Sequence, residues 1–181
     1  MPAGAVEYFE VYDEAGTSLG LAPRAACHGN PRLIHRTAHV VIFNSCGALL
    51  LQKRSARKDI QPGKWDTAVG GHLAPGESWE HAACREMTEE LGLAGDHPLR
   101  FLFHTRIRNS VESEDVAVFA AVDEGPFHPP PEEIDEVRFW TLGELWEALG
   151  TGVFTPNLES ELALLQNLGQ LPRAPACPSH E

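Results

Sequence analysis

Three glutamates in the middle of the chain are spaced so that their carboxylates could hold a metal ion together. Glu86, Glu89 and Glu90 stand at i, i+3 and i+4, so on a helix they rise from one face, a turn apart. Carboxylates crowded in this way repel one another unless a cation lies above them. Mg²⁺ binds carboxylate oxygens and shares its remaining ligands with water and substrate phosphates. The spacing therefore predicts a metal site for phosphate chemistry, with a solvated acidic helix face as the ordinary alternative.

The neighbouring residues predict the helix that carries these glutamates. Met87 and Leu91 belong to an apolar stripe that recurs every four residues and would face a core. Ser78 is expected to cap the N-terminus, and Gly92 is expected to end the helix. The approach, residues 70–76, contains three glycines and a proline and predicts a tight loop. A buried helical face beside a tight loop favours a metal site over a solvated surface.

The segment 71–93 fits the pattern G-x5-E-x7-R-E-U-x-E-E-x-G-U, where U is a bulky aliphatic residue. Its constrained positions are filled by Gly71, Glu77, Arg85, Glu86, Met87, Glu89, Glu90, Gly92 and Leu93. The segment resembles the signature of Nudix hydrolases. The resemblance implies that the three glutamates ligate Mg²⁺ or Mn²⁺, with the backbone carbonyl of Gly70 as a further ligand. It also implies that Glu77 and Arg85 brace the loop against the helix.

A longer pattern, through residues 35–77, resembles one branch of this superfamily. It includes His-Arg before a strand, then LLLQ, PGKW, GGH and GES, and is similar to isopentenyl-diphosphate isomerase and its hydrolase-like bacterial relatives. The isomerases bind a metal through histidines and glutamates outside the signature helix. The matching positions here are His28, His35, His72, Glu112 and Glu114. The resemblance implies either a second metal site or a remnant satisfied by hydrogen bonds.

Gly70 decides between the two activities. The isomerases move a proton with a cysteine just before the Gly-His of this segment, and Gly70 has no side chain to do so. The isomerases also typically lack the complete glutamate motif. We therefore expect hydrolysis of the diphosphate bond in a nucleoside diphosphate linked to another moiety. An isomerase and a non-catalytic nucleotide-binding domain are the alternatives.

Two further roles are open at this level. The general base is either Glu89 or Glu90 within the helix, or a residue of the later acidic run that contains Glu133 and Glu136. Residues 53–58 form a basic cluster in an acidic chain and precede the signature loop closely. Within it, Arg54 and Lys58 are expected to bind substrate phosphate.

Strand and helix patterns alternate irregularly along the chain. A hairpin is expected over residues 6–22, a buried strand over 40–43, later strands over 99–107 and 116–122, and a last helix over 155–168. This order predicts an α/β domain over residues 1–170, with a mixed sheet between the signature helix and the C-terminal helices. The Nudix resemblance implies the same α/β/α sandwich. Residues 171–181, with three prolines, are expected to be a disordered tail.

The net charge and the positions of the cysteines limit the kinds of partner and metal site that the chain can have. The net charge of −12 argues against nucleic-acid binding, whereas a small phosphorylated substrate stays compatible because a metal reverses the local field. The N-terminus lacks the pattern of a signal peptide, and no apolar run is long enough to cross a membrane. The four cysteines form no CxxC pair, so neither a zinc site nor a disulfide framework is expected. We expect a cytoplasmic protein; dimers are common among its relatives.

Overall fold

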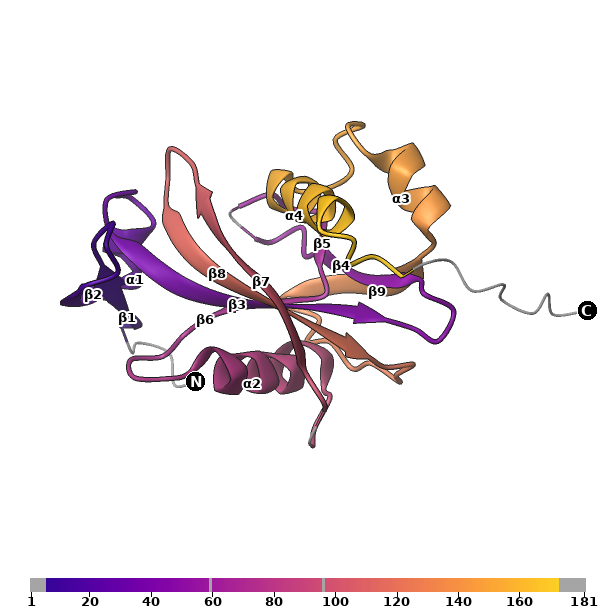
Figure 1. Ribbon diagram of the computed structural model, residues 1–181, viewed down its shortest axis with the longest axis horizontal. Helices are drawn as coiled ribbons and strands as arrows, with labels where there is room; N and C mark the ends of the chain where they lie inside the picture. Colours follow the sequence, from indigo (N-terminus) through magenta and orange to yellow (C-terminus); the bar gives the residue numbers. More distant parts are fainter. Residues whose placement is uncertain (1–5, 59, 96, 173–181) are drawn as a thin grey trace, which may run out of the picture.

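The structure is a computed structural model that describes residues 6–58, 60–95 and 97–172 (Figure 1). Its strands form one mixed sheet, with helix α2 against one face and α3 and α4 against the other. The expected α/β sandwich is thereby confirmed. The strands are β1 (Tyr8–Tyr12), β2 (Ser18–Pro23), β3 (Ile34–Phe43), β4 (Leu49–Arg54), β5 (Trp65–Thr67), β6 (Val69–His72), β7 (Arg100–Arg108), β8 (Ser113–Val122) and β9 (Ile134–Trp140). The helices are α1 (Arg24–Cys27), α2 (Trp79–Leu91), α3 (Leu142–Ala148) and α4 (Pro156–Asn167).

Strand β3 is the centre of the sheet. It pairs in parallel with β8 over its whole length and antiparallel with β6 near its middle and with β4 at its end. Alternate residues of a strand point to opposite faces. On β3, Ala38, Val40 and Ile42 pack in the cluster beneath α2, while Val41 and Phe43 pack in the cluster with α4. One strand therefore supplies both halves of the core.

Helix α2 begins and ends where the sequence predicted. The Ser78 side chain accepts a hydrogen bond from the backbone N–H of His81 at 3.2 Å, and Gly92 adopts a left-handed conformation with φ 69°. Met87 and Leu91 are completely buried against the sheet. These contacts fix which face of the helix turns away from the core, and hence where its glutamates lie.

The two glycines expected in a loop lie in a strand. Val69–His72 forms β6, which pairs antiparallel with β3 from Thr37↔His72 to Val40↔Val69. Long-range pairing overrides the low strand preference of glycine. Gly71 leaves room for a side chain of α2, because a Cβ built on it would overlap the end of the Glu86 side chain. A larger residue at this position would displace the Glu86 carboxylate from where it lies.

Two other expectations need correction. Leu171, assigned to the tail, packs against the α4 cluster, and residues 173–181 lie outside the described residues. Cys46 is disulfide-bonded, contrary to the expectation of no disulfide, whereas Cys27 and Cys84 are free.

The N-terminal hairpin is confirmed as β1 and β2. It meets the central strand at the pair Tyr12↔Ile34 and has a small core of its own, formed by Phe9, Val11, Ala22 and Cys27.

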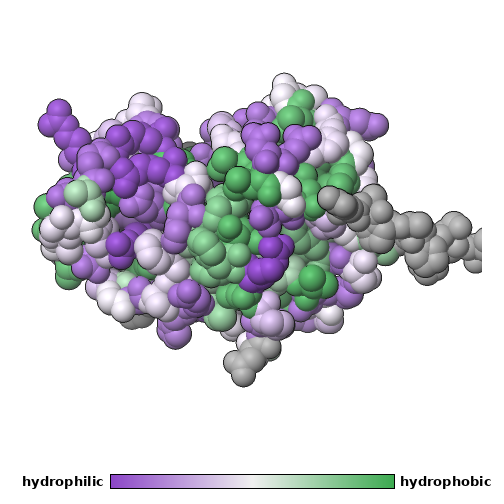
Figure 2. All heavy atoms as spheres, viewed as in Figure 1, coloured by the Kyte–Doolittle hydropathy of each residue, from purple (hydrophilic) through white to green (hydrophobic). Residues whose placement is uncertain are grey.

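Elsewhere, Figure 2 shows apolar residues gathered in the middle of one face, over β7. Among the described residues, no helix is long and apolar enough to cross a membrane.

Candidate active site and metal centre

A clamp between Arg85 and Glu77 holds the loop before α2 against the helix. Arg85 Nε and Nη2 donate to the two carboxylate oxygens of Glu77 at 3.0 and 2.9 Å, and Nη2 also donates to the carbonyl of His72 at 3.0 Å. These charge-assisted bonds lower the pKa of Glu77 to about 2. The bracing role that the resemblance implied for these two residues matches this geometry.

The three helix glutamates occupy distinct environments. Glu86 Oε1 accepts a 2.6 Å bond from Arg85 Nη1, and the same nitrogen lies 3.3 Å from Glu89 Oε2. The Glu89 side chain is 59% exposed. Glu90 Oε2 instead accepts from the backbone N–H of Gly70 at 3.1 Å and from Gln52 Nε2 at 3.2 Å. Arg85 therefore neutralises part of the negative charge on this face.

Burial and crowding raise the affinity of these carboxylates for protons. Burial, followed by the charge of Glu86, raises the pKa of Glu90 to about 8. Burial also raises the pKa of Glu86, against the effect of Arg85. A bound cation would offset the same repulsion, which is the condition expected of metal ligands. In the described ranges, however, the carboxylate oxygens of these three glutamates do not all converge to within 4.8 Å of one another.

The two residues predicted to bind phosphate have structural partners. Arg54 Nη1 lies 3.2 Å from Asp66 Oδ2, and its Nε donates to the carbonyl of Ile60 at 3.1 Å. Lys58 Nζ forms a 3.0 Å ion pair with Glu133. The charges of Lys58 and Glu133 both act on the pKa of Glu90, so this pair borders the glutamate helix.

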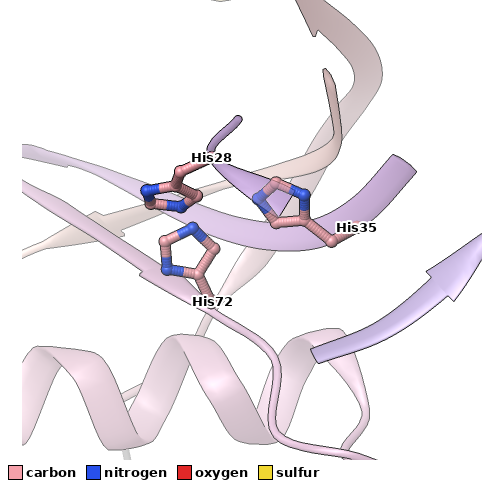
Figure 3. Close-up of side chains that lie close together, drawn as sticks. All are labelled: His28, His35 and His72. Carbon is pink, nitrogen blue, oxygen red and sulfur yellow. The ribbon is translucent and has the colours of Figure 1, made fainter. Parts of the chain in front are cut away.

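The five histidines and glutamates named from the resemblance converge in space. Three ring nitrogens, Nε2 of His28, His35 and His72, face one another and are buried without a hydrogen-bond partner (Figure 3). Glu114 Oε1 lies 3.4 Å from His35 Nε2 and 3.2 Å from His72 Nε2. Glu112 Oε2 lies 3.5 Å from His28 Nε2. We refer to these five residues as the His/Glu cluster.

The His/Glu cluster joins distant parts of the chain. His28 follows α1, His35 lies on β3, His72 ends β6, and the two glutamates lie before and at the start of β8. Burial and the neighbouring His72 lower the pKa of His28 to about 4, which keeps that imidazole neutral. Although burial opposes it, the nearby imidazoles of His35 and His72 hold the pKa of Glu114 well below its usual value. Imidazole nitrogens beside a carboxylate are ligands that suit a divalent cation.

Several residues at these sites were missed from the sequence. Gln52 could have been noticed in the sequence, because it is a polar residue at the end of an apolar run. In the structure its side chain donates a hydrogen bond to Glu90. Thr37 donates to Glu114 Oε1 at 2.9 Å. Phe9 lies against the histidines with no local signal in the sequence.

The fold, the Arg85–Glu77 clamp and the glutamate helix agree with the comparisons with known proteins. The NUDIX domain model matches residues 33–158, and the chain belongs to the Nudix family. It is 34% identical over 165 residues to an uncharacterised Nudix hydrolase of Yersinia pestis, covering 90% of this chain and 87% of that protein. It is 35% identical over 162 residues to an isopentenyl-diphosphate Delta-isomerase of Nocardia farcinica, covering 86% and 92%.

Solved structures support the fold independently. A crystal structure from Deinococcus radiodurans superposes with a TM-score of 0.75 at 22% identity, covering 92% of this chain and 100% of the other. A sequence identity this low supports a shared fold and nothing more. The substrate and the bound ion must be argued from the residues of this chain.

Proposed function

We propose that this protein is a metal-dependent hydrolase that cleaves the diphosphate bond of a nucleoside diphosphate linked to another moiety. The observation that carries the proposal is the placement of Glu86 and Glu90 beside β6, where Gly71 leaves room for the Glu86 carboxylate and the backbone N–H of Gly70 donates to Glu90. The complete glutamate motif stands on a helix whose orientation is fixed by the Arg85–Glu77 clamp.

The donor sets fit divalent cations at two places. Glu86, Glu89 and Glu90, with the Gly70 carbonyl, would hold Mg²⁺ or Mn²⁺, and the His/Glu cluster would hold a second divalent ion. The unpartnered, buried Nε2 atoms of the cluster support the second assignment. A bound divalent ion neutralises phosphate charge and lowers the pKa of a water ligand.

The remaining roles fall to protein groups near Glu90. Glu89 is the general base that the geometry favours, because it is the most exposed of the three and has only a 3.3 Å contact with Arg85. Glu133 is the alternative, since it borders Glu90 through its pair with Lys58. Lys58 would exchange this carboxylate for a substrate phosphate. Arg54, held by Asp66, would act from a fixed position at the same edge.

A substrate panel tests this proposal. Wild type should convert at least one linked nucleoside diphosphate to a nucleoside monophosphate and the phosphorylated moiety with Mg²⁺ or Mn²⁺, and chelation should abolish the activity. Glu89→Gln should lower kcat by about 100-fold if it is the base. Glu80→Gln, on the first turn of the same helix, should match wild type.

The outcomes separate the alternatives. Equal turnover by wild type and Glu89→Gln would move the base to another residue. Nucleotide binding without turnover under either metal would favour a non-catalytic binding domain and overturn the proposal.

Isomerisation of isopentenyl diphosphate is the second candidate, supported by the His/Glu cluster and by relatives named as that isomerase. The absence of a side chain at Gly70 opposes it. We expect wild type to incorporate no deuterium into isopentenyl diphosphate in deuterium oxide, as measured by proton NMR with Mn²⁺ and Mg²⁺ present. Exchange well above a protein-free control would establish the isomerase instead.

A further inference from the structure

The His/Glu cluster lacks the hydrogen bonds that usually orient metal-binding histidines. Such a histidine normally donates its second ring N–H to a carboxylate or carbonyl, which fixes the plane of the ring. Here His35 Nδ1 lies 3.4 Å from the carbonyl of Leu33, a long contact. For His28 and His72, the described part of the chain provides no hydrogen bond to Nδ1. Something else must hold these rings.

Phe9 supplies a contact of a different kind. Its ring stacks on His72 with centroids 4.3 Å apart and an interplanar angle of 17°, and on His35 at 5.0 Å and 13°. His28 lies further away, at 6.1 Å and 39°. Near-parallel rings at these separations attract one another beyond the effect of area burial. One phenyl ring therefore covers the flat faces of two imidazoles.

The phenyl ring is itself fixed. Phe9 is 2% exposed and packs in the hairpin core with Val11, Ala22 and Cys27. Rotation of either imidazole about its Cβ–Cγ bond would drive a ring edge into this phenyl face. Stacking thus restricts His72 and His35 to the planes in which their Nε2 atoms point at Glu114 Oε1, at 3.2 and 3.4 Å.

We propose that Phe9 is a positioning residue of the divalent-metal site formed by the His/Glu cluster. Its ring does the orienting that hydrogen bonds to Nδ1 do elsewhere, and so sets the affinity of the site for cations that imidazole and carboxylate ligands suit. This inference rests on the second metal site of the proposed function. It also extends that site beyond the matched domain, because Phe9 and His28 both precede residue 33.

Metal binding to the full chain tests the role of Phe9. The protein is stripped with a chelator and titrated with Mn²⁺ by calorimetry and with Co²⁺ by visible absorption, which reports ligand geometry directly. Phe9→Leu keeps an apolar side chain and removes the ring. It should weaken metal binding at the cluster by about 10- to 100-fold and change the Co²⁺ absorption bands. Phe9→Tyr, which keeps the ring, should retain the wild-type spectrum.

Phe119→Leu is the matched control. Phe119 is also 2% exposed, but it lies in the core cluster beneath α2 and stacks on none of the three histidines. Both Phe→Leu variants should lose thermal stability, whereas only Phe9→Leu should lose metal affinity. Should Phe9→Leu fail to fold, Phe9→Met offers similar bulk without a flat ring. His72→Gln identifies which binding phase belongs to the cluster.

Each contrary outcome has a definite meaning. Equal metal affinity in wild type and Phe9→Leu overturns the proposal, and so does an equal loss in the two Phe→Leu variants. A wild type whose binding and Co²⁺ spectrum are unchanged by His72→Gln has no metal site at the cluster, which removes the basis of the inference. The diphosphate hydrolase assignment is judged separately, by turnover of the substrate panel.

Discussion

Replacing Glu90 by glutamine is expected to lower kcat for diphosphate hydrolysis by about 100-fold or more. Glu90 is the helix carboxylate most enclosed by the protein, with Gly70 N–H and Gln52 on one oxygen. Glutamine preserves the size of the side chain but removes the negative charge that would bind a cation. Steady-state kinetics at several Mg²⁺ concentrations measure the effect. The concentration of Mg²⁺ needed for half-maximal rate should rise together with the loss in kcat.

A variant of Gln52 separates the charge of Glu90 from its position. Gln52→Leu leaves the carboxylate in place but removes one of its two hydrogen bonds, so a smaller loss is expected than for Glu90→Gln. Thermal denaturation controls for folding, since neither substitution creates a large cavity. If Glu90→Gln had the same kcat as wild type at low Mg²⁺, that result would contradict the metal-binding role proposed for the helix.

Local rules predicted the parts of the site that lie on one element. Helix α2 follows from an N-cap, an apolar stripe and a terminal glycine, and the glutamate spacing then follows from helical geometry alone. The His/Glu cluster came from a resemblance instead. Composition does not indicate that His35 and Glu114 meet, because strand pairing between β3 and β8 brings them together.

The errors arose where tertiary contacts decide the outcome. Gly70 and Gly71 have low strand preference, and pairing with β3 places them in a strand. Phe9 resembles any other hairpin residue until the hairpin is docked on the histidines. Each of these features depends on a partner that is distant in sequence, and the periodicity of a sequence gives no information about such partners.

A buried ion pair next to the site makes a second large prediction. His39 on β3 and Glu161 on α4 are 9% and 6% exposed, and His39 Nδ1 lies 2.7 Å from Glu161 Oε2. Burial alone would lower the pKa of His39, but the charge and hydrogen bond of Glu161 outweigh it and raise the pKa to about 9. Breaking a buried pair by removing one charge leaves the other uncompensated, at a cost of about 3–5 kcal/mol.

Glu161→Gln should therefore destabilise the protein in a pH-dependent way. A histidine whose pKa rises from 6.5 to about 9 on folding contributes stability that is fully present below pH 6.5 and is lost as pH rises through 9. The deficit of Glu161→Gln in free energy of unfolding should be about 3 kcal/mol at pH 6 and much smaller at pH 9.5. Denaturant unfolding at the two pH values measures it, with Glu147→Gln, an exposed glutamate of α3, expected within about 0.5 kcal/mol of wild type at both. A deficit that is the same at both pH values would show that Glu161 acts through packing, because a charge-dependent contribution must vanish once His39 loses its proton.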